Sequence, residues 1–145
     1  MAHRIQKSIQ IAAAPAVVFD INQDYDRRLE WDTFLKKAEL IDTDKAEVGG
    51  KAWCVSKYGL GMETRYVSFN HPRVTAVEMR DSSVVFKSFA GSWRFEQQEE
   101  QSSKVIFIYS YELKTYLKLT SPIIKWVLAR DVSQRLRDLK TYIKN

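Results

Sequence analysis

Six segments between residues 37 and 117 share one pattern: each is rich in β-branched and aromatic residues, and each ends in a short turn. Gly, Pro, Asp and Ser mark these turns, which are too short to hold a crossover helix. Strands joined in this way pair with their neighbours in antiparallel directions. The pattern therefore predicts an antiparallel sheet, with strands at residues 37–44, 51–58, 62–70, 74–80, 84–97 and 105–117.

One further strand and three helices flank this region. Polar and apolar residues alternate over residues 4–11, which predicts a half-buried strand. Pro15 suits the first turn of a short helix, and residues 24–31 predict a second one. Pro122 opens a long final helix, whose apolar stripe consists of Leu128, Ala129, Val132, Leu136, Leu139 and Ile143.

A single long helix can cover only one face of seven strands. Because so wide a sheet twists, we expect it to curl around the helix and to leave space between the two. The strand at residues 105–117 begins apolar on both faces, which predicts a central position in the sheet. In the strand at residues 84–97 the apolar positions change parity, and we expect a bulge at Gly91, where a bend costs least.

The length and composition of the chain are typical of one globular domain. The chain has 145 residues, enough for a single well-filled core, so we expect one domain over residues 1–145. Cys54 is the only cysteine, which excludes an intrachain disulfide. No run approaches the ~20 apolar residues of a membrane span, and no signal peptide opens the chain, so a cytoplasmic location is expected.

The positive charge is concentrated near the C-terminus. Net charge is +5, and residues 114–145 contribute +6 from eight Lys or Arg and two Asp. Two interpretations remain open, a solvated helix face or a surface for an acidic partner or membrane.

Several motifs, taken in order, resemble the START/polyketide-cyclase/pollen-allergen (SRPBCC) superfamily. APAVVFDI resembles its first helix, RRLEWD its second, VSFNHPR a strand end with a Pro turn, FAGSWRFEQ its sixth strand, and LRDLKTYI its closing helix. The resemblance covers nearly the whole chain. It implies an α+β helix-grip fold, in which a seven-stranded curved antiparallel sheet surrounds a long C-terminal helix, with two short helices between strands 1 and 2.

The same resemblance implies a deep, mostly apolar cavity between the sheet and the last helix, holding a lipid, polyketide, steroid or similar molecule. Trp31 would turn inward to plug or line one end, and the polar residues 24–30 around it would face water. Rings are abundant on the strands, and their polar edges suit amphipathic ligands. The expected ligand-binding residues, each also compatible with plain core packing, are Trp31, Trp53, Tyr58, Arg65, Tyr66, Phe86, Trp93, Tyr109, Tyr111 and Leu128.

Two neighbouring predicted strands carry Glu63, Arg65, Glu78 and Arg80. If these side chains point outward, they form weak cross-strand ion pairs. If two point inward, they orient a ligand or act as acid and base, and an inward Arg65 could hold a carboxylate or an enolate.

Other chemistry has little support in the sequence. Two His and one Cys without ligand spacing make a metal site unexpected, and nothing local links His71 to Cys54 as a base to a nucleophile. The chain contains neither GxGxxG nor GxxxxGK[ST], so no cofactor is expected. The basic helix face lacks interleaved aromatics beyond Trp126, so no nucleic-acid partner is expected.

The start of the last helix, SPIIKWVLAR, carries a separate hypothesis. Ile123, Trp126 and Val127 project off the apolar stripe. Either loops from the short helices cover them, or they form an exposed apolar tip beside basic residues. Such a tip would suit peripheral docking on an anionic membrane, with the basic residues being Lys118, Lys125 and Arg130.

Three functions are therefore compared. The first is binding, and in one version transport, of a hydrophobic small molecule in an internal cavity. The alternative is a cyclase or dehydratase acting on a polyketide-like substrate, which also needs an inward acid or base. A protein-interaction module using the basic helix would instead have a filled core and no pocket.

Overall fold

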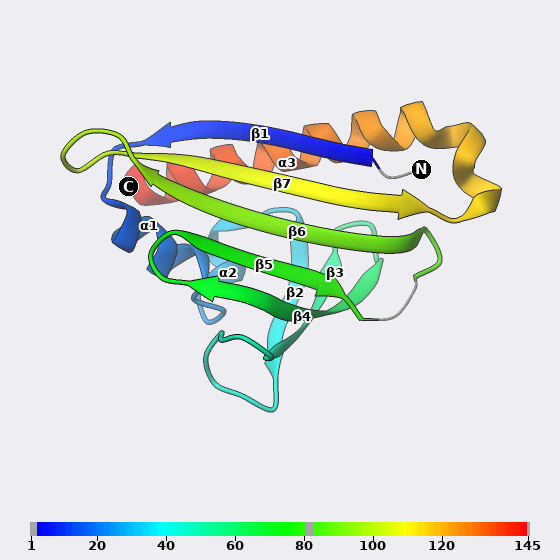
Figure 1. The fold of residues 1–145 in the computed structure, drawn as a ribbon, viewed down its shortest axis with the longest axis horizontal. Helices are drawn as coiled ribbons and strands as arrows, with labels where there is room; N and C mark the ends of the chain where they lie inside the picture. Colours follow the sequence, from blue (N-terminus) through cyan, green and yellow to red (C-terminus); the bar gives the residue numbers. More distant parts are fainter. Residues whose placement is uncertain (1–2, 81–82, 145) are drawn as a thin grey trace.

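The computed structural model describes residues 3–80 and 83–144. The chain order is one strand, two short helices, six strands, one 3₁₀ turn and one long helix (Figure 1). The elements are β1 (His3–Ile11), α1 (Pro15–Asn22), α2 (Arg28–Trp31), β2 (Leu35–Ile41), β3 (Lys51–Ser56), β4 (Gly61–Asn70), β5 (Val74–Met79), β6 (Phe86–Gln97), β7 (Ser103–Leu113), η1 (Thr115–Thr120) and α3 (Ser121–Lys144).

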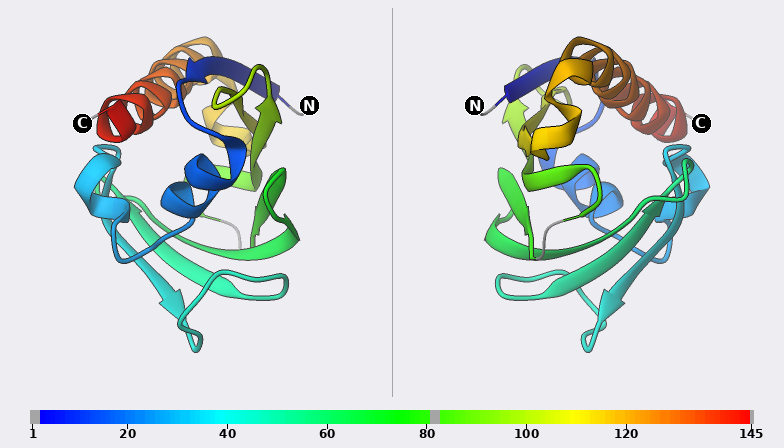
Figure 2. Two further views of the ribbon diagram at one scale, coloured as in Figure 1. Left: turned by 90° about the vertical axis from the view of Figure 1, so that its left-hand side faces the viewer. Right: turned by 90° about the vertical axis from the view of Figure 1, so that its right-hand side faces the viewer.

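All seven strands form one antiparallel sheet in the order β1-β7-β6-β5-β4-β3-β2. Every strand after β2 pairs with its predecessor in the chain, as the short turns predict. The sheet curves strongly around the inner side of the molecule, and α3 lies against the β1–β7 end of it (Figure 2). The predicted α+β helix-grip architecture is confirmed.

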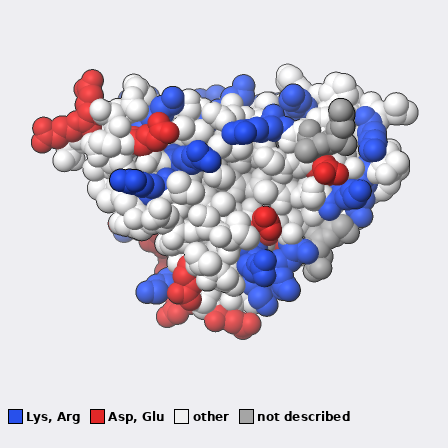
Figure 3. Space-filling view, viewed as in Figure 1, with Lys and Arg blue, Asp and Glu red and all other residues white. Residues whose placement is uncertain are grey.

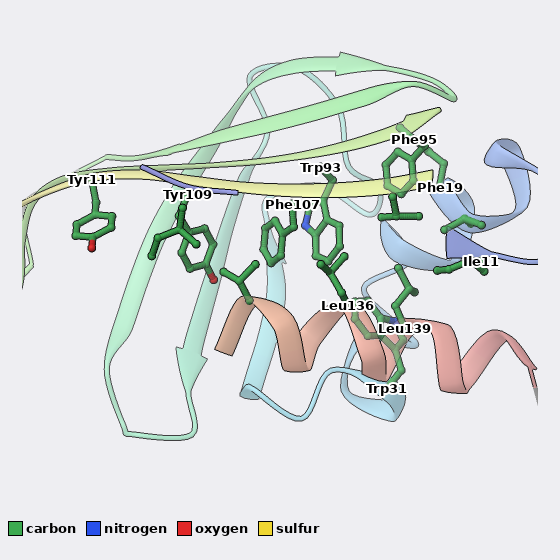
Figure 4. Packing of buried hydrophobic residues seen from close by; sticks show 14 of the residues in the cluster. Ile11, Phe19, Trp31, Trp93, Phe95, Phe107, Tyr109, Tyr111, Leu136 and Leu139 are labelled. Carbon is green, nitrogen blue, oxygen red and sulfur yellow. The ribbon is translucent and has the colours of Figure 1, made fainter. Parts of the chain in front are cut away.

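Strand β7 is the centre of the packed half of the molecule. It lies between β1 and β6, and Val105 to Tyr109 are all buried. Its odd-numbered residues point toward α3, where they meet Leu136 and Leu139 of the helix stripe (Figure 4). β7 is thus an inner strand, as its two apolar faces predict, but it is second in the sheet order, next to the edge strand β1, and not in the middle of the sheet as expected.

Helix α1 closes one end of the curved sheet. Pro15 opens the helix in its first turn, as expected, and Val18 and Phe19 are buried. The Phe19 ring lies 5.2 Å from that of Phe69 and 5.3 Å from that of Phe95, measured between centroids. Aromatic side chains therefore fill this end.

Three local expectations need correction. The second short helix begins only at Arg28, because residues 24–27 form turns instead. The last strand ends at Leu113, and the η1 turn replaces its expected continuation. The bulge in β6 lies between Phe86 and Ser88, whereas Gly91 pairs regularly with Tyr109.

The bulge has a local cause in the loop before β6. The Ser83 hydroxyl accepts hydrogen bonds from the backbone N–H groups of Val85 and Phe86, at 3.2 and 2.9 Å. The Ser83 hydroxyl holds the backbone just before β6, and the bulge lies at the first residues of this strand. The other two residues of the expected turn, Asp81 and Ser82, lie outside the described residues.

Candidate functional site

A cavity of about 630 Å³ lies between the curved sheet and α3. Strands β3 to β7 supply its walls, the start and middle of α3 close it on one side, and the α1–α2 segment reaches it from the end. Most of its lining is apolar. A volume of this size suits a drug-sized ligand.

The exposure of the lining residues distinguishes a mouth from a floor. Tyr58, Val84 and Ile123 line the cavity and are exposed at the surface. They come from the β3–β4 turn, the β5–β6 loop and the first turn of α3, so the mouth lies where these three segments meet. Arg28 and Arg135 line the cavity but are buried, and therefore form its floor.

Stacked rings form the inner wall along β6 and β7. The Trp93 ring stacks on Phe107 with centroids 3.7 Å apart, and Phe107 meets Tyr109 edge-on at 5.0 Å. Figure 4 shows these rings projecting from the sheet toward α3. Gly91 lies beside them and adds no side chain, which leaves space over the Tyr109 ring.

The floor is built around the carboxylate of Asp32, which is 0% exposed. Arg28 Nε donates to Asp32 Oδ2 at 2.9 Å, across the single turn of α2. Arg135 Nη2 donates to the same oxygen at 2.9 Å, and Arg135 Nε lies 3.2 Å from both oxygens. This ion cluster joins α2 to α3 at a position four residues before Leu139, within the apolar stripe of the long helix.

Charge, more than burial, decides the ionisation of this cluster. Burial by itself raises the pKa of Asp32, but Arg135 and Arg28 outweigh it, so the pKa lies below its ordinary value. Burial works to lower the pKa of Arg135, yet Asp32 and Tyr109 raise it above normal. Asp32 and Arg135 are therefore both charged at neutral pH.

Each of the two guanidinium groups also contacts an aromatic ring, and one of them bonds to a hydroxyl. Arg28 lies over the Trp31 ring at 4.9 Å, and Arg135 lies over Phe34 at 4.8 Å. Arg135 Nη1 also donates to the Tyr109 hydroxyl. These contacts hold the cations in an otherwise apolar region.

A second polar group lies beside the floor. The Tyr66 hydroxyl donates to Gln23 Oε1 at 2.6 Å and lies 2.9 Å from the Tyr25 hydroxyl. Because Tyr66 has one proton, Tyr25 must donate to it. Burial, followed by the neighbouring Tyr25, raises the pKa of Tyr66 well above its usual value, so both phenols remain neutral.

The mouth has its own buried carboxylate. Asp131 of α3 accepts hydrogen bonds from the Tyr58 hydroxyl at 3.1 Å, and Lys57 Nζ lies 3.6 Å from its Oδ1. The side chain of Asp131 is almost fully covered, whereas that of Lys57 is partly exposed. This pair links the β3–β4 turn to α3.

Six of the ten predicted ligand-binding residues line the cavity: Tyr58, Tyr66, Phe86, Trp93, Tyr109 and Leu128. The structure places the other four elsewhere. Trp31 and Tyr111 are buried in the core, and Trp53 packs its ring against Gly61. Arg65 is exposed on the outer side of the sheet. Their part in binding remains a prediction.

The four charged residues of β4 and β5 do not line the cavity. Arg80 Nη1 donates to Glu63 Oε2 at 2.8 Å on the surface, as the outward alternative predicts. Arg65 faces Glu78 in the strand register, and both are exposed.

The sequence interpretation missed the two arginines of the floor. Residues 24–30 were expected to face water, but Arg28 is buried because it pairs with Asp32 and lies against Trp31. The i,i+4 spacing of Arg28 and Asp32 was the available signal. Arg135 likewise occupies the apolar side of the final helix, three residues after Val132, where a charge is unusual.

In residues 3–80 and 83–144, no three His, Cys, Asp or Glu side chains gather as metal ligands would. None of the helices in this part of the chain combines the length and hydrophobicity needed to cross a bilayer.

Fold and cavity together define a helix-grip protein with an internal, mainly apolar chamber. The family model described as polyketide cyclase/dehydrase and lipid transport matches residues 2–144. The chain therefore belongs to this family, and the resemblance found in its motifs is confirmed. A comparison with curated proteins gave no match.

Solved structures of low sequence identity share the fold. The Zhui aromatase/cyclase from Streptomyces sp. R1128 is 11% identical, with a TM-score of 0.86 over 99% of this chain and 94% of that one. A START superfamily protein from Mycobacterium smegmatis is 13% identical, with a TM-score of 0.83 over 98% and 97%. Norcoclaurine synthase from Thalictrum flavum is 11% identical, with a TM-score of 0.75 over 100% and 88%.

Proposed function

We propose that this protein binds a hydrophobic small molecule, such as a lipid or a polyketide, inside the cavity between the sheet and α3. The observation that supports this function best is the cavity itself, with about 630 Å³ of space and a mainly apolar lining. Burial of apolar ligand surface in such a space supplies the affinity. A protein-interaction module would instead have a filled core.

A cyclase or dehydratase is the second candidate, and the buried arginines favour it. A guanidinium at the floor could stabilise an enolate formed during ring closure. The acid and base that such a reaction needs are less evident. Glu63 and Glu78 lie outside the cavity, and Asp32 is held ionised with both oxygens occupied by Arg135. Binding therefore ranks first.

The region next to the mouth supports peripheral membrane contact as part of the proposal. Leu119 is 97% exposed, and Ile123 and Trp126 are also exposed. Residues 113–130 contain no acid, and their basic residues are Lys114, Lys118, Lys125 and Arg130. In Figure 3 basic side chains are spread over the face shown, and several lie at the end of the molecule where η1 and the start of α3 lie in Figure 1. An anionic bilayer fits this combination of exposed apolar and positive groups.

Native mass spectrometry of the purified protein tests the binding function. A co-purifying hydrophobic molecule, released on denaturation and identified by extraction, would support it. Val77 lines the cavity, so Val77→Phe should reduce the bound fraction and the uptake of the neutral dye Nile red. Val67→Phe, at an exposed position of β4, is the matched control. Equal dye binding by both variants and the wild type would contradict the proposal.

A further inference from the structure

The floor of the cavity holds more positive than negative charge. Arg28 and Arg135 both line it and are both 6% exposed, and the carboxylate between them belongs to Asp32. Among the described residues the other buried acid is Asp131, whose cation is Lys57 and which does not line the cavity. One positive charge at the floor is therefore not balanced by a buried acid in this part of the chain.

One donor group of the Arg28 guanidinium is not used by its neighbours. Its Nε donates to Asp32, and its Nη1 donates to the Asn22 carbonyl at 2.9 Å. Arg135, in contrast, uses Nε, Nη1 and Nη2 on Asp32 and Tyr109. Over residues 3–80 and 83–144, the Nη2 group of Arg28 has no hydrogen-bond acceptor.

The neighbouring hydroxyls do not supply that acceptor. The Tyr66 hydroxyl bonds to Gln23 and to Tyr25, and the Tyr25 hydroxyl bonds to Tyr66; neither makes a hydrogen bond with Arg28 in the described part of the chain. The rings of Trp31 and Trp93 face the Arg28 guanidinium at 4.9 and 5.9 Å. Ring faces attract a cation but accept no conventional hydrogen bond from its N–H groups. Two buried cations that share one carboxylate leave a net positive charge, which is costly to bury.

We propose that the cavity takes a hydrophobic molecule with an anionic oxygen group, a carboxylate in the simplest case, and that this group binds the Nη2 group of Arg28 at the floor. The inference rests on the proposed binding function and specifies its ligand class. A carboxylate oxygen can accept a charge-assisted hydrogen bond from this Nη2 group. The apolar part of the ligand then lies along the Trp93–Phe107 wall and reaches the mouth near Val84 and Ile123.

Competition against Nile red bound to the wild-type protein tests the charge preference. Dodecanoate, dodecanol and methyl dodecanoate share one chain and differ only in the head group. We expect dodecanoate to displace the dye at concentrations about 10- to 100-fold lower than the two neutral compounds, the range of a charged hydrogen bond. An NMR titration of carboxyl-labelled dodecanoate should also give a lower pKa for the bound acid than for the free acid.

Two substitutions place the preference at Arg28. Arg28→Met removes the charge but retains the bidentate Asp32–Arg135 pair, and should reduce dodecanoate affinity about 10-fold or more while the affinity for dodecanol changes little. Arg65→Met makes the same chemical change on the outer face of the sheet and should change neither. If Arg28→Met fails to fold, Arg28→Lys retains the charge and should retain part of the preference.

The outcomes separate this inference from the function on which it rests. Equal displacement by all three dodecyl compounds, or a raised pKa of the bound acid, would overturn the anion preference and leave the binding function intact. An unchanged preference in folded Arg28→Met would overturn the assignment to Arg28. Failure of the dye and of all three compounds to bind would overturn the proposed function and the inference together.

Discussion

The Tyr58 hydroxyl lies 3.1 Å from each carboxylate oxygen of Asp131, and this contact ties the β3–β4 turn to α3 beside the mouth of the cavity. One partner is exposed and the other is 2% exposed. The hydrogen bonds therefore join a surface side chain to a fixed point on the helix. A movement of the β3–β4 turn away from α3 would break them.

Removal of this contact should speed ligand exchange. We expect Tyr58→Phe to raise the dissociation rate of Nile red several-fold, with a loss of about 1 kcal/mol in the free energy of unfolding. Stopped-flow fluorescence measures the rate. Tyr142→Phe is the control, because it removes a tyrosine–carboxylate hydrogen bond to Glu30 at another place on the surface. A similar acceleration in both variants would argue against a specific role for Tyr58.

The ion cluster at the floor should dominate the effect of charge on stability. We expect Asp32→Asn to lower the free energy of unfolding by about 3–5 kcal/mol at pH 7, because it leaves two buried cations without an anion. Urea denaturation measures the change. Asp20→Asn, which removes an exposed carboxylate, should have little effect.

The same variant carries a pH signature. The pKa of Asp32 is lowered in the folded protein, so its stabilisation is fully present above its unfolded pKa of about 3.9 and is lost as the pH falls through the folded value. The stability gap between wild type and Asp32→Asn should therefore be constant from pH 7 to about pH 5 and narrow below about pH 4. A gap that stays constant down to pH 3 would contradict the assignment of a buried, ionised Asp32.

Two glycines should respond oppositely to the same substitution. A Cβ atom at Gly61 would lie 2.6 Å from the Trp53 ring, so we expect Gly61→Ala to cost about 1–3 kcal/mol in unfolding free energy. At Gly91 a Cβ would meet the Tyr109 ring at 3.8 Å, an ordinary contact, and Gly91→Ala should be neutral or slightly stabilising. In a Trp53→Leu background the cost at Gly61 should shrink, and an unchanged cost would exclude the ring as its cause.

The alkylation rate of the Cys54 thiol should show whether a ligand occupies the cavity. It is the only cysteine and it lines the cavity. Burial raises the pKa of its thiol, whereas Arg28 and Arg135 lower it in part. Iodoacetamide alkylation, followed by mass spectrometry, should therefore be slow at pH 7 and accelerate with rising pH, and Arg28→Met should move the profile to higher pH. A bound ligand should slow the reaction, and equal rates with and without ligand would place the ligand elsewhere.

The exposed tip near the mouth should bind anionic membranes. We expect sedimentation with vesicles that contain phosphatidylglycerol, weak sedimentation with neutral vesicles, and loss of binding at high salt. Leu119→Asn combined with Trp126→Ser should abolish sedimentation. Leu29→Asn, at an exposed apolar position on α2, should not. Equal binding to neutral and anionic vesicles, or binding to neither, would remove the membrane proposal.

The repeated strand pattern was sufficient to predict the sheet, because short turns allow only neighbouring antiparallel pairs. Of the wall residues on β6 and β7, Trp93 and Tyr109 were predicted as rings on strands, whereas Phe107 was not, because β7 is apolar on both faces and burial does not alternate along it. The expected pair of Arg65 and Tyr66 could not both face the cavity. The two residues are adjacent in β4, and successive strand residues point to opposite faces, so an inward Tyr66 already places Arg65 on the outer face.

The floor could not be predicted because its partners are distant in the chain. Asp32 and Arg135 are 103 positions apart and meet only after α3 packs across the sheet. Charged side chains in a polar stretch are usually solvated, so Arg28 looked like a surface residue. Only the i,i+4 relation of Arg28 and Asp32 was local enough to be recognised in advance.

The positions of the cation and of the apolar opening at opposite ends give the chamber a direction. In the proposed binding mode, a ligand with one anionic head and one apolar tail is held with its head at the floor. In this orientation the apolar tail of the ligand lies at the mouth of the cavity. Handover to an acceptor would begin from the tail, with the head the last part to let go.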